Sequence, residues 1–242
     1  MVLVSRNKVA SFFSSFLLVA ILVISTDAFS AQANDLEQML KDLDEKAQKA
    51  STQKEKEQIL KTKAFFSILA ADMKAHPNPS QEREDVIARI KAQFGKYHNT
   101  LEDLRKAAEE DKGDRSRFSV GEDHLGENYW KDSADTWHHS NDYKTKLRID
   151  QVLSKIGLSK ETYQQYMAMM KSLGAERITT SKVGSKNSTS LIFYRGGLSV
   201  SGCSVTVTKA DERPKPFGIK GKGDFMDVIE LGDKWFIEHE CT

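Results

Sequence analysis

The last third of the chain, residues 159–240, constrains the possible fold most strongly. It contains five runs rich in β-branched and aromatic residues, and Gly, Asn, Asp, Ser and Pro separate these runs. Short runs of this kind, bounded by turn-forming residues, are typical of antiparallel strands. Gly232-Asp233 predicts a tight hairpin turn between the last two. The predicted strands are residues 177–181, 190–195, 198–208, 225–231 and 234–240.

A helix is predicted directly before these strands. Ser159 is a good N-cap, and Gly174 stands where a left-handed C-terminal cap is expected. Between them, apolar residues recur at spacings of three and four, which places them on one helix face. These residues are Tyr163, Tyr166, Met167, Met170 and Leu173. Residues 158–242 therefore predict a helix packed on an antiparallel sheet.

The preceding region, residues 34–113, reads as helical. Apolar residues at helical spacing follow Asp35, and a polar stretch at 51–58 leaves open whether residues 34–75 form one helix or two. Two prolines in the segment 76–79 must end that helix. Residues 80–112 then carry the longest apolar stripe of the chain: Val86, Ile87, Ile90, Phe94, Tyr97, Leu101, Leu104 and Ala108.

The fold class is therefore predicted as α+β, with an N-terminal helical hairpin region followed by the helix and sheet. The short Pro-containing link predicts that the helices on either side of it form an antiparallel hairpin. The stripe at 80–112 fits packing on the protein's own core, and it also fits a coiled-coil seam with a partner or a second copy. Residues 114–157 are predicted as an irregular connection rich in aromatic residues and His, with a short helix at its end.

Residues 1–33 have the order of a secretory signal peptide. Arg6 and Lys8 precede an uncharged apolar stretch at 9–26, and Ala31-Gln32-Ala33 offers small residues at a cleavage site. We expect cleavage after Ala33 and a periplasmic or secreted protein; a retained membrane anchor is the alternative. After cleavage no stretch remains that is apolar enough to span a membrane.

Charge limits the classes of partner. The whole chain carries a formal net charge of +1, and cleavage would remove two basic residues and one acidic residue, leaving a neutral protein. Both signs are interspersed, whereas nucleic-acid binding normally needs a concentrated basic face. We therefore expect no nucleic-acid partner. Oligomeric state stays open.

The only two cysteines are Cys203, inside a predicted strand, and Cys241, just after the last one. In an exported protein a pair of cysteines is most simply one disulfide. If the last strands formed a simple meander, an intervening strand would hold the two sulfurs too far apart. The bond therefore predicts that the last strand lies beside the Cys203 strand, or that the tail crosses the end of the sheet.

Two functional hypotheses arise from the segment 114–157. Tyr129, Trp130, Trp137 and Tyr143 concentrate large rings, which recognition surfaces favour. They predict a non-catalytic exported protein, without a cofactor, that binds a protein, a peptide or an envelope component. The alternative is an extracytoplasmic hydrolase, possibly zinc-dependent, because the segment also holds three potential zinc ligands: His124, His138 and His139. No motif identifies catalytic residues.

Overall fold

The computed structural model describes residues 29–76, 78–132, 134–183, 186–196, 202–220 and 223–241. Two compact units divide the chain, the first ending at Asn78 and the second beginning at Pro79. The basic and apolar parts of the predicted signal peptide lie outside the described residues. The predicted cleavage site after Ala33 lies inside the first described helix.

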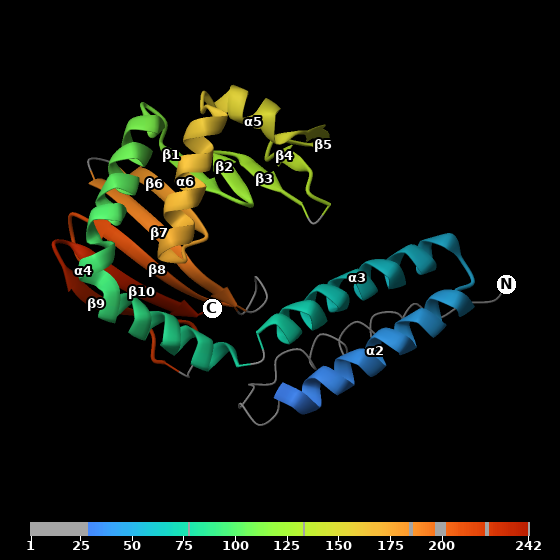
Figure 1. The fold of residues 1–242 in the computed structure, drawn as a ribbon. Coiled ribbons are helices and arrows are strands. Elements are labelled where there is room, and N and C mark those ends of the chain that lie inside the picture. Colours follow the sequence, from blue (N-terminus) through green and yellow to red (C-terminus); the bar gives the residue numbers. More distant parts are fainter. Residues whose placement is uncertain are drawn as a thin grey trace. The chain divides into compact units, whose positions relative to one another are not determined.

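The first unit is an antiparallel pair of helices, α2 (Phe29–Lys49) and α3 (Gln53–Ala75), shown in Figure 1. The polar stretch at 51–58 thus contains a break followed by a new helix start, where the Thr52 hydroxyl accepts a hydrogen bond from the Glu55 N–H (3.2 Å). Leu36, Leu43 and Ala47 of α2 are buried. A helical hairpin does precede the sheet, but it consists of α2 and α3.

The second unit contains a ten-stranded sheet in which every recorded pairing is antiparallel. The spatial order of the strands is β5-β4-β3-β2-β1-β6-β7-β8-β10-β9. The helices of this unit are α4 (Pro79–Lys112), α5 (Ile149–Ile156) and α6 (Lys160–Leu173). The strands are β1 (Arg117–Gly121), β2 (His124–Gly126), β3 (Tyr129–Lys131), β4 (Trp137–His139), β5 (Asp142–Leu147), β6 (Arg177–Val183), β7 (Lys186–Gly196), β8 (Cys203–Ala210), β9 (Phe225–Gly232) and β10 (Trp235–Cys241).

The prediction of α+β with a helix on a C-terminal antiparallel sheet is confirmed. Strands β6 to β10 match the five predicted runs, although β8 begins at Cys203 and residues 198–201 lie outside the described part. Helix α6 has both predicted caps: the Ser159 hydroxyl accepts from the Thr162 N–H, and Gly174 is left-handed. The tight turn before β10 falls one residue later than expected, at Asp233-Lys234, where both φ angles are positive.

The prediction of an irregular connection over residues 114–157 is wrong in its first part. Residues 117–147 form the strands β1 to β5, and only the predicted short helix, α5, is as expected. Three of these strands have three residues each, so no alternation of apolar and polar residues has room to appear. Their pairing depends on successive hairpins, which place each short strand beside the next.

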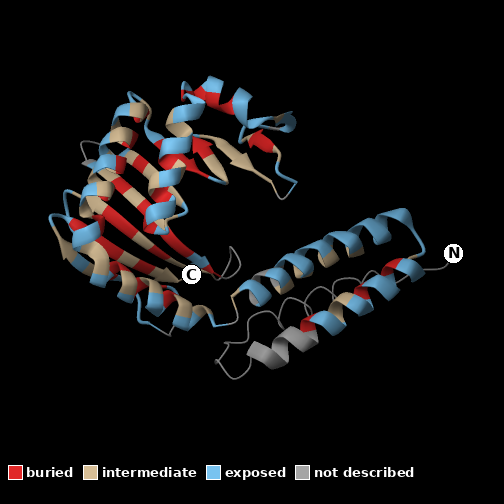
Figure 2. Ribbon diagram, viewed as in Figure 1, coloured by how far each residue is buried: buried red, intermediate tan, exposed pale blue. Residues whose placement is uncertain are grey.

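One row of apolar side chains runs across the sheet and forms the centre of the core. Strand pairing aligns one residue from each of seven strands, and side chains aligned in this way share a face. The row is Leu125, Val120, Ile178, Leu191, Val207, Ile237 and Ile229. The first six of these are fully buried, and Ile229 packs at the margin of the same core. Figure 2 shows the buried residues along the sheet and on the helices above it.

Helix α4 supplies the other half of this core. Its buried residues include Ile90, Leu101 and Leu104, each at most 1% exposed, and they belong to one cluster with the row of the sheet. The stripe at 80–112 therefore packs on the protein's own sheet, as the first of its two interpretations predicted. Because α4 uses its apolar face on the sheet, it belongs to the second unit.

Glu102 joins α4 to the sheet through polar contacts. Its Oε1 accepts hydrogen bonds from Trp235 Nε1 and Lys209 Nζ, both at 2.9 Å, and its Oε2 accepts one from Arg105. Burial alone would raise the pKa of Glu102, but these hydrogen bonds outweigh burial and lower it to about 2. The carboxylate therefore stays charged at neutral pH and anchors the helix.

Candidate functional site

A cavity of about 430 Å³ opens between the short strands and the two short helices of the second unit. Its apolar walls are Trp137, Leu147, Ile149 and Tyr163, and its polar lining is Lys131, Asp135, Thr136, Lys146 and Arg148. We refer to these nine residues as the cationic cavity. Three of its lining residues are basic and one is acidic.

Strand pairing explains how the wall of the cavity is built. Lys131 of β3 lies opposite Trp137 of β4, which lies opposite Leu147 of β5, so their side chains share one face. Tyr163 reaches the same space from the first turn of α6. Burial raises the pKa of the Tyr163 hydroxyl above its ordinary value.

The positive charges of the cavity are unequally paired. Lys131 Nζ lies 2.9 Å from an oxygen of Asp135 and 6.0 Å from the centre of the Trp137 ring. Arg148 binds Asp150, but both side chains are more than 60% exposed, so this pair contributes little. Lys146 forms no ion pair with any described residue. The cavity therefore has positive charge that its own carboxylate does not neutralise.

The four aromatic residues predicted as a binding surface have different environments. Trp137 is 3% exposed and is both a core residue and a wall of the cavity. Trp130 is half-buried and stacks on His138, with ring centres 4.8 Å apart. Tyr129 packs edge-on against His139. Tyr143 lies in β5, and its side chain is outside the described part. Of the described three, the structure brings only Trp137 to the cavity.

The three histidines predicted as metal ligands do not converge. His124 pairs with Trp130, and Trp130 pairs with His138, so a whole strand separates the two histidines, about 10 Å at ordinary strand spacing. His139 is the next residue and points to the opposite face. Zinc ligands lie only about 2 Å from the ion. Among the described residues, no group of three or more His, Cys, Asp or Glu side chains is placed to hold a metal ion.

His124 and His138 have carboxylate partners instead. His138 is buried, and its Nε2 lies 2.8 Å from Asp132 Oδ2. Two backbone N–H groups also donate to Asp132, and the hydrogen bond with His138 is the main cause that lowers the pKa of this carboxyl. His124 Nδ1 lies 3.1 Å from Asp123.

Asp123 is the centre of an ion network that the sequence analysis missed. Its carboxylate lies 3.0 Å from Arg195 Nη1 and 3.6 Å from Arg177 Nη1, and Arg195 also binds Glu176 at 2.9 Å. Burial would raise the pKa of Asp123, but the hydrogen bond with His124 and the two guanidinium charges lower it well below its usual range. This permanently charged group ties the β1–β2 turn to β6 and β7. Arg177 and Arg195 are more than 50 residues from Asp123 in sequence, so no local spacing indicates these two contacts.

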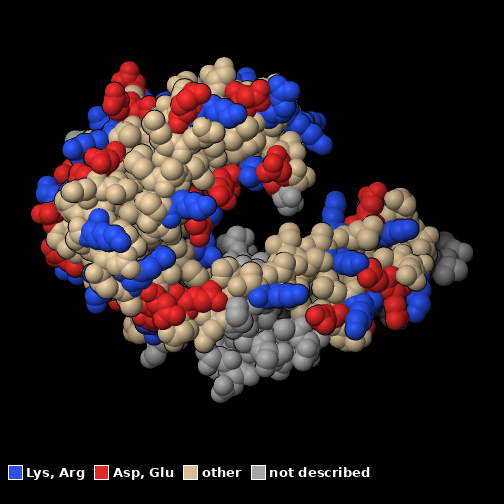
Figure 3. All heavy atoms as spheres, viewed as in Figure 1, with Lys and Arg blue, Asp and Glu red and all other residues tan. Residues whose placement is uncertain are grey.

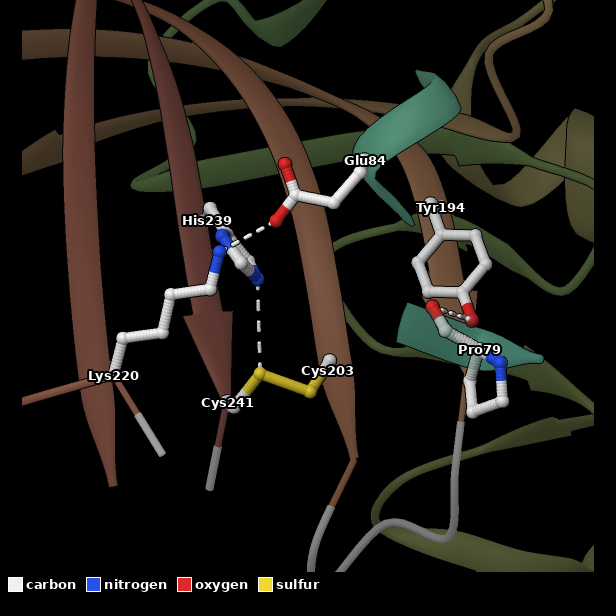
Figure 4. The surroundings of a disulfide bond; sticks show 7 residues. All are labelled: Pro79, Glu84, Tyr194, Cys203, Lys220, His239 and Cys241. Carbon is white, nitrogen blue, oxygen red and sulfur yellow. Dashed lines mark hydrogen bonds and ion pairs between the residues drawn. A yellow bond between two sulfur atoms is a disulfide. The ribbon is translucent and has the colours of Figure 1, made fainter. Parts of the chain in front are cut away.

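The disulfide between Cys203 and Cys241 is confirmed, and of the two arrangements that it allowed, the structure has the last strand beside the Cys203 strand. The two residues are directly opposed on β8 and β10, with Cα atoms 4.1 Å apart. Figure 4 shows His239 beside the bond, with its Nε2 3.8 Å from Cys241 Sγ. Burial, and then the positive charges of Arg83 and Lys220, lower the pKa of His239 to about 4.

The comparisons with known proteins identify no relative. No family model matches the chain, and searches of curated proteins and of solved structures also find no match. Within the described residues, no helix is both long and apolar enough to cross a membrane. On the face drawn in Figure 3, basic and acidic side chains are interspersed over the surface.

Proposed function

We propose that the mature chain is an exported, non-catalytic binding protein and that the cationic cavity is its binding site. The signal-type order of residues 1–33 supports export to the periplasm or the outside of the cell. The disulfide is consistent with this proposal, because such bonds persist mainly in oxidising compartments.

The observation that carries the proposal is the pairing of an aromatic wall with unneutralised positive charge in one cavity. Its volume falls within the range of roughly 300–1,000 Å³ that ligand sites usually have. The half-buried Tyr163 ring offers apolar surface, and Lys146 and Arg148 attract an anion. The ligand is therefore a protein, peptide or envelope component that presents a carboxylate or phosphate beside a flat apolar group.

A zinc-dependent hydrolase is the less supported alternative. It would need three ligands around one ion, and the separation of His124 from His138 by the whole of strand β3 argues against their sharing one. No other observation on the described residues favours hydrolysis. Binding without catalysis therefore accounts better for the arrangement.

Chemical cross-linking in the envelope fraction of the source cells tests the proposal. The mature chain should capture a partner, and Lys146→Glu should reduce capture at least tenfold because it reverses the unpaired charge. Lys144→Glu is the matched control, since Lys144 is exposed on the same strand and does not line the cavity. Equal capture by the Lys146→Glu variant and the wild type would refute the assignment of the site.

Export is tested separately by the intact mass of the protein recovered from the exported fraction. We expect a chain that begins at Asn34. A full-length species retained in membranes would instead identify residues 1–33 as an anchor.

A further inference from the structure

The loop between β8 and β9 presents two large apolar side chains to solvent. Phe217 is 47% exposed and Ile219 is 63% exposed, the highest value for a large hydrophobic residue in the described part of the chain. Only Gly218 separates them, and neither belongs to the hydrophobic core cluster. Because removing apolar surface from water is favourable, a surface that covers both side chains gains free energy.

Backbone contacts hold this loop against β9. The Phe217 N–H donates to the Met226 carbonyl oxygen (3.1 Å), and the Met226 N–H donates to the Phe217 carbonyl oxygen (2.8 Å). Gly218 is left-handed, with a φ of +70°, and a Cβ atom there would collide with the Asp224 carbonyl oxygen. The exposure of Phe217 and Ile219 is therefore a property of a fixed turn that only glycine can form.

Positive charge surrounds the apolar pair. Residues 213–220 contain three basic residues and no acidic residue; acidic residues flank the segment at 211, 212 and 224. Lys215 is exposed and forms no ion pair with any described residue. Lys220 reaches Glu84 (2.5 Å; Figure 4), but their side chains are 58% and 47% exposed, so water and salt weaken this pair. Arg213 donates to a backbone carbonyl oxygen of β9. The segment therefore attracts anions beside its apolar tip.

The size and charge of this segment restrict what can cover it. A standard protein interface takes roughly 20–30 residues and about 800 Å² from each partner, far more than two apolar side chains offer. A second copy of the chain would bring two positively charged segments together, and like charges repel. A lipid bilayer needs no matching patch, because its binding of a peripheral segment depends on buried apolar area and on attraction between basic residues and anionic headgroups.

We propose that the segment 213–220 docks the mature chain on an anionic lipid surface. Phe217 and Ile219 insert between the headgroups, and Lys215 and Lys220 bind the headgroup charge. Two inserted side chains and a few charges give reversible attachment, in contrast to a membrane-spanning helix. The proposal does not depend on the cationic cavity, since none of the residues that line the cavity belongs to this segment.

Co-sedimentation with lipid vesicles tests the proposal. The protein is the chain that begins at Asn34, so that the apolar stretch at 9–26 contributes nothing. At about 0.1 M salt it should bind vesicles that contain phosphatidylglycerol at least tenfold more tightly than vesicles of phosphatidylcholine alone, and added salt should weaken this binding.

Variants of the loop separate its apolar and charged contributions. The double variant Phe217→Ser with Ile219→Ser should bind at least tenfold more weakly, and so should Lys215→Glu. Ile68→Ser is the matched control, because Ile68 is 62% exposed and lies in the first unit; it should bind like the wild type. All the changed positions are exposed, so thermal unfolding should be nearly unchanged.

Three results would overturn the proposal. The first is a wild type that binds neither kind of vesicle or binds both equally. The second is a double variant, Phe217→Ser with Ile219→Ser, that binds like the wild type. The third is a loss of binding in Ile68→Ser as large as in the loop variants, which would place the lipid contact on α3.

Insertion itself is measured with a fluorescent label. Both cysteines of the chain are joined in the disulfide, so a single introduced cysteine can be labelled selectively. An environment-sensitive dye on Ile219→Cys should shift its emission to shorter wavelength when phosphatidylglycerol vesicles are added, and the same dye on Ile68→Cys should not. Unchanged emission from Ile219→Cys while the protein is bound to the vesicles would show that the loop stays in water, and the proposal would be wrong.

Discussion

Replacing Glu102 with Gln tests the polar anchor between α4 and the sheet. The change keeps the size of the side chain and removes the charge that Lys209 and Arg105 bind. Trp235 Nε1 keeps an acceptor if the amide oxygen takes the place of Oε1. We therefore expect the loss to come mainly from the two cationic partners.

The pKa of Glu102 sets the size of this loss. A decrease from the ordinary value of 4.5 to about 2 corresponds to about 3 kcal/mol, since one pKa unit is worth about 1.4 kcal/mol. The side chain is 17% exposed, and both cations keep a second partner, Asp233 for Lys209 and Glu109 for Arg105. We therefore expect Glu102→Gln to lower the free energy of unfolding at pH 7 by about 2 kcal/mol.

The difference in unfolding free energy between the wild type and Glu102→Gln should depend on pH. A carboxyl whose pKa is lower in the folded state stabilises the protein above its unfolded pKa, and this contribution disappears as pH falls through the folded value. The gap between the wild type and Glu102→Gln should therefore be full above about pH 5. More than half of it should be lost by pH 3.

Urea denaturation at pH 7, 5 and 3 measures the gap. Asp103→Asn is the control, because Asp103 is the next residue on the same helix and is exposed; its effect should stay within about 0.5 kcal/mol at every pH. A gap for Glu102→Gln that is below 0.5 kcal/mol at pH 7, or that does not shrink on acidification, would refute the role of Glu102.

Three further predictions follow from other parts of the second unit. Trp137→Ala should cost about 3–5 kcal/mol in thermal or urea unfolding because the ring is 3% exposed, whereas half-buried Trp130→Ala should cost clearly less; equal losses would contradict this. Acidification from about pH 6.5 to 4 should destabilise the wild type more than the His239→Gln variant. Over this range His239 becomes protonated in the unfolded chain but stays neutral in the folded protein, where its pKa is about 4; parallel stability profiles of the two proteins would refute this prediction. Reducing the Cys203–Cys241 bond, which closes a loop with a sequence separation of 38, should cost about 3–4 kcal/mol in chemical unfolding, and an unchanged midpoint would contradict that estimate.

The sequence by itself determined the elements whose signals are local. The stripe at 80–112 predicted α4 because helical spacing places its apolar residues on one side, and Ser159 and Gly174 marked both ends of α6. The two cysteines were enough to predict the bond and, because the reach of a disulfide is short, to reduce the possible arrangements of the last strand to two, of which the structure has the adjacent pair β8 and β10.

Only the tertiary structure decided how β1 to β5 pair and which charges meet. Strands of three residues carry no readable period, and their register comes from the hairpins between them. The cationic cavity depends on that register, because it aligns Lys131 and Trp137 under α6. Glu102 likewise binds Lys209, and Asp123 binds Arg177, and each pair is more than 50 positions apart in sequence. Sequence spacing says nothing about such contacts, since folding alone brings distant charges within a few ångströms.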